Sequence, residues 1–310
     1  MLFQRVLITG ANGLLGQHLV ARMSGFAEYD VLATGRDSGP RFPASSCGYA
    51  PLDITDYDAV ARLMDDFTPT VVVNCAAMTK VDQCEQEREA CWNVNADAVG
   101  NLAKACRKHS TRLVQVSTDF VFDGSSGPYR EDARPNPVNF YGRSKLAGEN
   151  AVREAGLDNW VIARTVLVYG TAHNLSRTNI ALWVIDNLRE GNPIHVVTDQ
   201  WRTPTYAPDL AAGIEKLVRH RKAGIYHLSG SDFLTVFDFA QALARVFDLD
   251  ASLINPTTSE ELNQVADRPP RTGFIVLKAA SEIGYKPRSI DASLRALGRE
   301  LGLSVTTPSP

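Results

Sequence analysis

The sequence has no long hydrophobic run, no paired cysteines and no clustered histidines. None of its apolar stretches approaches the ~18 residues that a membrane-spanning helix needs, and its start, MLFQRVLITGANG, lacks the pattern of a cleavable signal. The five cysteines include no CxxC pair, and the six histidines are scattered singly. This spacing disfavours a zinc site and is typical of reduced thiols. We therefore expect a cytoplasmic protein without a metal.

The chain also lacks an excess of charge of one sign. It carries 32 basic and 35 acidic side chains, a formal net charge of −3. This balance argues against broad attraction to nucleic acid or to an anionic membrane, so we expect neither as a partner. With 310 residues and 44% hydrophobic residues, the chain can bury the core of an ordinary globular protein.

Strand-like and helix-like stretches alternate through the first half of the chain. Alternation of this kind predicts a parallel sheet with helices on both faces, a doubly wound α/β fold of the Rossmann type. The expected strands cover residues 5–9, 31–34, 71–74, 113–117 and 160–165, and the expected helices cover residues 13–23, 57–67, 85–109 with a break near 93–95, and 139–154.

After residue 170 the pattern loosens, and prolines separate shorter elements. A helix over 208–220 and a strand over 225–228 are expected to return to the main sheet. The sequence therefore predicts an NADP-binding domain and a smaller C-terminal substrate-binding lobe. The first covers residues 1–168 plus about 204–228, and the second about 169–203 plus 229–310.

A glycine-rich turn joins the first predicted strand to the first predicted helix. Its three glycines, Gly10, Gly13 and Gly16, have the spacing GxxGxxG. The first permits a tight turn, the second lets a pyrophosphate approach the backbone, and the third lets the helix pack close to the strand. The N–H groups at the helix start attract the phosphates. The alternative is a glycine turn with a structural role only.

The residues after the second predicted strand indicate which dinucleotide binds. An acidic residue there would bind the ribose 2′-hydroxyl, whereas an arginine accommodates a 2′-phosphate. The sequence reads Thr34-Gly35-Arg36, with no acid before Asp37. Arg36 therefore favours NADP(H), with NAD(H) as a second cofactor that the chain could accept. A solvated surface arginine is the alternative.

A YxxxK motif lies on the helix predicted over 139–154. Tyr141 and Lys145 are four residues apart and share one helix face. Because a free tyrosine has a pKa near 10, we expect the lysine ammonium and an oxidised nicotinamide to lower it for proton exchange. Thr118 ends a predicted strand, at the sheet edge where ligands bind, and can hydrogen-bond the substrate oxygen.

Together these motifs resemble the extended short-chain dehydrogenases/reductases, and more closely the dTDP-4-dehydrorhamnose reductase family. The resemblance covers residues 5 to about 285. It rests on the blocks VNCAAMTKVD (73–82), NVN (93–95), STDFVFDG (117–124), the YxxxK helix (141–149), DQWRTPT (199–205) and DRP (267–269).

The resemblance implies reduction, with NADPH, of a 4-keto group on a nucleotide-linked deoxysugar, dTDP-4-dehydrorhamnose in the family. It implies Thr118, Tyr141 and Lys145 as the catalytic triad. The expected cofactor-binding residues are Gly10, Asn12, Gly13, Leu14, Leu15, Gly16, Arg36, Asp53, Ile54, Cys75, Ala76, Ala77, Asn95, Ser117, Tyr141 and Lys145. The expected substrate-binding residues are Thr79, Val81, Thr118, Asp119, Phe120, Leu167, Trp201, Arg202 and Arg268.

Two positions depart from the family pattern. Leu167 stands where the family has a tryptophan that faces the sugar, and Arg202 stands where a small residue is usual. Both leave open a reductase or epimerase for a different nucleotide sugar. They also leave open a non-catalytic NADP-binding subunit resembling the regulatory β subunit of methionine adenosyltransferase. A homodimer is a further expectation.

Two arginines in the C-terminal half are candidates for substrate contacts. Neither Arg202 nor Arg268 lies in an apolar periodic stretch, so we expect both outside the core. Arg202 is placed near the sugar. Arg268 is placed near the nucleotide diphosphate, because a guanidinium binds phosphate in bidentate fashion. For the Arg268 segment, a rigid surface loop is the alternative.

Overall fold

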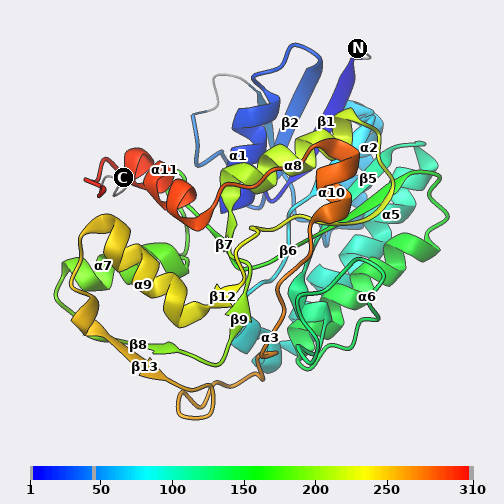
Figure 1. Cartoon of the computed structure of the whole chain (residues 1–310). Coiled ribbons are helices and arrows are strands. Elements are labelled where there is room, and N and C mark those ends of the chain that lie inside the picture. Colours follow the sequence, from blue (N-terminus) through cyan, green and yellow to red (C-terminus); the bar gives the residue numbers. More distant parts are fainter. Residues whose placement is uncertain (1–2, 44–46, 307–310) are drawn as a thin grey trace.

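The computed structural model describes residues 3–43 and 47–306. At its centre is a seven-stranded parallel sheet in the order β11-β6-β5-β4-β1-β2-β3, which confirms the predicted Rossmann-type fold (Figure 1). The strands are β1 (Gln4–Thr9), β2 (Tyr29–Gly35), β3 (Gly48–Pro51), β4 (Val71–Asn74), β5 (Arg112–Thr118), β6 (Trp160–Thr165) and β11 (Gly224–His227).

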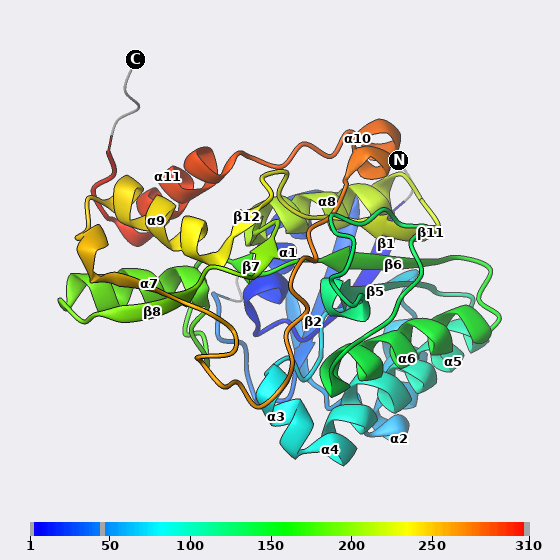
Figure 2. The same cartoon turned by 60° about the horizontal axis from the view of Figure 1, so that its bottom comes forward.

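Helices cover both faces of the sheet because its strands are apolar on both sides. In β1, Val6 and Ile8 pack with one cluster of buried side chains and Leu7 with another. Helices α1 (Leu14–Met23), α8 (Ala207–Arg219) and α10 (Leu277–Ile283) cover the first face. On the other face lie α2 (Tyr57–Phe67), α5 (Ala98–Lys108) and α6 (Phe140–Glu154), as Figure 2 shows.

A smaller group of elements has a hydrophobic cluster of its own beside the sheet (Figure 2). It contains α7 (Ile180–Arg189), α9 (Val236–Phe247) and α11 (Ile290–Leu301), with β8 (Ile194–Val197) paired in parallel with β13 (Ile254–Thr257). The sequence predicted shorter elements here without giving the bounds of these helices and strands. A start signal was present for α9, where Thr235 and Asp238 form a reciprocal cap.

Two features of the first half also differ from the prediction. Strand β3 was missed, because its four residues include a glycine and a proline and none of them is fully buried. The long predicted helix starts earlier and is divided into α3 (Val81–Gln86), α4 (Arg88–Trp92), a π-helical turn (Asn93–Asp97) and α5. The predicted break near 93–95 coincides with that turn.

Strand β11 returns to the sheet, as predicted, and pairs with β6. The small strand pairs β7–β10 and β9–β12 lie between the sheet and the smaller group; they comprise β7 (Val168–Tyr169), β10 (Thr205–Tyr206), β9 (Trp201–Arg202) and β12 (Leu234–Thr235). The exact division into two domains remains a prediction. Across residues 3–43 and 47–306, no helix is both long and apolar enough to cross a membrane.

The glycine turn between β1 and α1 has the close contacts that its spacing predicts. Gly10 has φ +64°, and a Cβ there would lie 2.7 Å from the Ala76 nitrogen. A Cβ on Gly16 would collide with the Gly10 carbonyl oxygen and lie 2.7 Å from Ala11 Cα. The absence of side chains therefore sets how closely α1 and β4 approach the turn.

We expect Gly16→Ala to lower the free energy of unfolding by about 1–3 kcal/mol, because backbone must move to admit the methyl group. Urea unfolding followed by circular dichroism measures the change. Gly39→Ala is the matched control, since a Cβ there meets no atom within 4 Å. Equal stability of the two variants would show that the turn relaxes freely.

Candidate active site

The packing of α6 against the end of β5 assembles the predicted catalytic residues. Thr118 is the last residue of β5, and Tyr141 and Lys145 lie on the first two turns of α6. The helix starts at an Asn139 cap, whose side-chain oxygen accepts from the Gly142 N–H at 2.8 Å. A Cβ on Gly142 would collide with the Phe120 carbonyl, so glycine lets the two segments meet.

All three predicted catalytic side chains are buried, with 7%, 8% and 5% exposure for Thr118, Tyr141 and Lys145. Burial raises the pKa of Tyr141 above its ordinary value. The Thr118 hydroxyl opposes this shift by hydrogen bonding, whereas Asp119 adds to it. The lowered pKa was expected with an oxidised nicotinamide bound beside Tyr141, and for that complex it stays a prediction. Burial outweighs the favourable contacts.

Lys145 faces the backbone of β5. Its Nζ donates to the Val116 carbonyl at 2.8 Å. Burial lowers the pKa of this ammonium to about 8, and the Glu149 carboxylate opposes that shift. Lys145 therefore begins to lose its proton at mildly alkaline pH.

Glu149 is a component of the site that the sequence motifs do not identify. It is fully buried and accepts from Ser117 Oγ at 2.7 Å. Arg164, on β6, donates to both of its carboxylate oxygens, at 2.8 and 2.6 Å. The signal was its position, four residues after Lys145 on the same helix. Ser117 was predicted to bind cofactor, and its hydroxyl donates to Glu149 inside the protein.

The predicted cofactor-binding residues gather at the carboxyl ends of neighbouring strands. The glycine turn with Leu14 and Leu15 follows β1, Cys75–Ala77 follow β4, and Asp53 and Ile54 follow β3. Asp53 Oδ1 accepts from the Thr55 N–H at 2.9 Å, and Ile54 is buried. Because β4 lies beside β1 and close to β5, one continuous edge leads from the glycine turn to Thr118.

Asn12 and Asn95 fix loops on either side of this edge. Asn12 Nδ2 donates to Asp37 Oδ2 at 2.8 Å, and its oxygen accepts from the Arg41 N–H at 3.0 Å. Asn95 exchanges two hydrogen bonds of 2.9 Å with the Met78 backbone and donates to Ser144 on α6. Both residues were predicted to bind cofactor, and both side chains hydrogen-bond within the protein.

Arg36 is exposed directly after β2, next to a carboxylate that is already paired. Arg41 donates to both oxygens of Asp37, at 2.8 and 3.2 Å, and these bonds hold the pKa of Asp37 below its usual range. Within residues 3–43 and 47–306, no hydrogen bond or ion pair engages the Arg36 guanidinium. Arg41 was not recognised from the sequence.

Arg202 does not lie outside the core as predicted, because only 3% of it is exposed. Its guanidinium donates to the Trp201 carbonyl at 2.8 Å and lies over the Phe120 ring. Its Nε is 3.8 Å from a carboxylate oxygen of Asp119, which is buried too. Since tertiary contacts supply acceptors on several sides, burial of the charge is tolerated.

Arg268 is largely covered as well, with 12% of its side chain exposed. It donates to Asp82 Oδ2 at 2.9 Å and to the Ala266 carbonyl at 2.8 Å. Asp82 belongs to α3, as does Val81, and Thr79 precedes that helix. The ion pair therefore fastens the loop after β13 to the segment that carries two predicted substrate residues.

Of the two remaining predicted substrate residues, Leu167 directly precedes β7 and Trp201 lies on β9. Leu167 has φ +38°, a conformation rarely adopted by a branched side chain, and packs with two hydrophobic clusters. Trp201 is half-buried against Phe233, with the Arg271 guanidinium 5.1 Å from its ring. Neighbouring residues of an extended strand point to opposite faces, so Trp201 and Arg202 are directed apart.

The cysteines form no disulfide, and no metal-binding cluster is found among the described residues. All five thiols are free. Over the described part of the chain, His, Cys, Asp and Glu side chains form no group of three that could hold a metal. The absence of a metal remains a prediction.

The pH dependence of stability should report the buried Lys145. Its pKa of about 8 lies below the ~10.4 of an unfolded chain, so the unfolded state binds more protons between these values. This group therefore makes stability rise with pH in that window, by about 3 kcal/mol for a two-unit difference.

Urea unfolding of wild type and Lys145→Met from pH 7 to 10.5 gives the difference. Lys104→Met, on exposed α5 surface, is the control. A difference in unfolding free energy between wild type and Lys145→Met that stays constant with pH would contradict the lowered pKa of Lys145.

Comparison with known proteins places these features in a family. Residues 4–302 match the family described as RmlD substrate binding domain. A dTDP-4-keto-6-deoxy-D-glucose reductase from Streptomyces niveus is 39% identical over 260 residues, which cover 83% of this chain and 84% of that protein. The methionine adenosyltransferase 2 subunit beta of Bos taurus is 33% identical over 92% of this chain and 84% of its own length.

A solved structure shows the same fold. The dTDP-4-dehydrorhamnose reductase of Bacillus anthracis, crystallised in complex with NADP, superimposes with a TM-score of 0.81 and 32% sequence identity. The match covers 96% of this chain and the whole of that one.

Proposed function

Because this chain belongs to the RmlD substrate binding domain family, the dTDP-4-dehydrorhamnose reductases and their relatives, we propose that it uses NADPH to reduce the 4-keto group of a nucleotide-linked deoxysugar. The observation that supports this most is that Thr118, Tyr141 and Lys145 meet at the sheet edge that continues past β4 to the glycine turn. Family membership confirms the predicted oxidoreductase class. We propose dTDP-4-dehydrorhamnose as the sugar, which would give dTDP-L-rhamnose.

The residues present fit a dinucleotide. Gly13 is the N-cap of α1 and provides no side-chain acceptor for the first N–H groups of the helix, which suit a pyrophosphate. Asp53 and Ile54 would contact the adenine, and Cys75–Ala77 would line the groove. Bound NADPH would supply the hydride. These side chains would hold it against the strand ends.

Tyr141 is the proposed proton donor in this reaction. Its raised pKa keeps the hydroxyl protonated at neutral pH, the state that an acid needs before it acts. Thr118 would orient the substrate oxygen toward it. Lys145 would bind the cofactor's ribose through N–H groups left free by its bond to Val116, and its charge would favour proton release from Tyr141.

Tyr141→Phe should remove most turnover and leave NADPH binding nearly unchanged, because only the proton donor is lost. NADPH consumption with dTDP-4-dehydrorhamnose measures turnover, and fluorescence titration measures binding. Tyr57→Phe is the control, since this tyrosine is 46% exposed on α2. A near-normal kcat at saturating substrate would rule out Tyr141 as the acid.

Arg36 is the proposed reader of the 2′-phosphate. Asp37, the acid that could bind a ribose diol, is already held by Arg41 and Asn12, whereas Arg36 is exposed. A charge-assisted phosphate contact is worth about 1.5–3 kcal/mol. This supports NADP(H) as the preferred cofactor, with NAD(H) as the weaker one.

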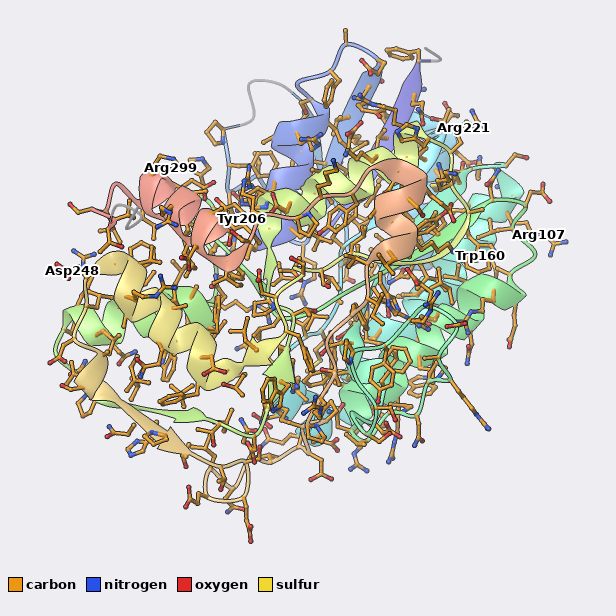
Figure 3. The ribbon with its side chains drawn as sticks, viewed as in Figure 1. Arg107, Trp160, Tyr206, Arg221, Asp248 and Arg299 are labelled. Carbon is orange, nitrogen blue, oxygen red and sulfur yellow. The ribbon has the colours of Figure 1, made fainter. Side chains whose placement is uncertain are left out.

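We expect Arg36→Ala to weaken NADPH binding about ten- to a hundredfold with little change for NADH. Calorimetric titration with both cofactors measures the two affinities. Arg107→Ala is the matched control, because Arg107 projects from the far end of α5 (Figure 3). Equal losses for the two cofactors would mean that Arg36 does not distinguish them.

The substrate contacts are proposed on residues of both the Rossmann domain and the smaller lobe. We place the nucleotide diphosphate near Arg268, whose ion pair with Asp82 leaves N–H groups of its guanidinium available. The remaining proposed substrate contacts are Phe120, Leu167, Trp201, Thr79 and Val81. We also propose a cytoplasmic location, where NADPH is available, and a homodimer as the assembly.

Two other functions have an observation in their favour. Similarity to the Streptomyces niveus enzyme favours a different 4-keto sugar, and a comparison of kcat/KM among sugar donors separates these substrates. Similarity to the methionine adenosyltransferase subunit favours a regulatory role. Binding of NADPH without consumption, over a panel of 4-keto nucleotide sugars, would support the regulator.

A further inference from the structure

A series of buried polar contacts connects the smaller lobe with the hydroxyl of Thr118. The Thr118 hydroxyl donates to Asp119 Oδ1 at 3.1 Å and accepts from the Phe120 N–H at 3.2 Å. The second carboxylate oxygen, Oδ2, accepts from the Thr272 hydroxyl and lies 3.8 Å from Arg202 Nε. Two residues remote in sequence thus contact the carboxylate beside Thr118.

Arg202 is held firmly in this position. One terminal nitrogen donates to the carbonyl oxygens of Trp201 and Pro270, at 2.8 and 3.3 Å, and the other donates to Gln200 Oε1 at 3.2 Å. These acceptors are neutral. Among the described residues, Asp119 is the acidic group within 4 Å of the guanidinium, so the carboxylate is its charge partner.

We propose that Arg202 is a positioning residue for the reduction and acts through Asp119 on Thr118 and Tyr141. The Thr118 hydroxyl has a single hydrogen, and Asp119 currently accepts it. An unbalanced carboxylate would hold that hydrogen more strongly and would oppose the negative charge that forms on Tyr141 as its proton leaves. The positive charge of Arg202 balances the Asp119 carboxylate and so weakens both effects. This inference rests on the proposed function.

Other charged and titratable groups face the same residues and must stay constant in a test. Tyr141 is also influenced by Cys84 on α3 and by Arg177 on the loop between β7 and α7. Arg202 is also influenced by Arg268 and Asp199. Lys145 follows Tyr141 on α6. Substitutions confined to Arg202 and Asp119 leave all of these in place.

Arg202→Met should lower kcat about tenfold or more at pH 8, while NADPH affinity stays unchanged. The deficit should shrink as the pH falls, because burial already raises the pKa of Asp119, and loss of its partner raises it further. A protonated Asp119 no longer opposes Tyr141. Arg202→Lys, which keeps the charge, should retain most activity.

The decisive variant is the double substitution Arg202→Met with Asp119→Asn. Because the amide carries no charge, it should restore kcat well above that of Arg202→Met alone. Arg245→Met controls for loss of an arginine, since Arg245 pairs with Asp291 on the exposed surface of the lobe. A double variant no more active than Arg202→Met, or a deficit constant from pH 6 to 9, would mean that Arg202 only supports the fold.

A substrate-free measurement separates this inference from the proposed function. A double-mutant cycle in urea unfolding should show Asp119 and Arg202 coupled by about twofold to a hundredfold in the unfolding equilibrium. Absence of coupling would overturn the inference. If the wild type reduces no keto sugar but the coupling is present, the proposed function is wrong, whereas the interaction between Asp119 and Arg202 is supported.

Discussion

The buried carboxylate of Glu149 is the contact on which the geometry of the site depends. It joins three elements, because it lies on α6, accepts from Ser117 on β5 and is paired with Arg164 on β6. A charge without exposure is tolerable only when such partners surround it. The partners here fix the height and rotation of α6 above the sheet. Tyr141 and Lys145 lie on the preceding two turns and inherit that placement.

The first half of the fold could be predicted from sequence because its signals are local. An uninterrupted apolar strand such as β4 and an amphipathic helix such as α2 were found with their exact bounds. The glycine turn and the YxxxK helix are local as well, since backbone clearance and four-residue spacing define them. The resemblance to a known family added the order of these motifs.

The second half could not be predicted in the same way, because its elements depend on partners remote in sequence. Two-residue strands such as β9 exist only through pairing with another segment. Arg202 shows the same limit for a single residue. A charged residue among polar neighbours indicates exposure, yet acceptors from Gln200, Pro270 and Asp119 make a buried position available. Such a set of acceptors is visible only after folding.

The charges buried around the proposed reaction centre explain why it needs both halves of the molecule. Burial raises the pKa of Tyr141 and lowers that of Lys145, so desolvation opposes both of the charges that proton transfer would use. The Glu149 carboxylate, on the same helix, favours the charged form of Lys145. Arg202, from the smaller lobe, balances the Asp119 carboxylate, which accepts from the Thr118 hydroxyl. A Rossmann sheet alone would supply the lysine and its support, but the balance at Asp119 requires the lobe to be folded against it.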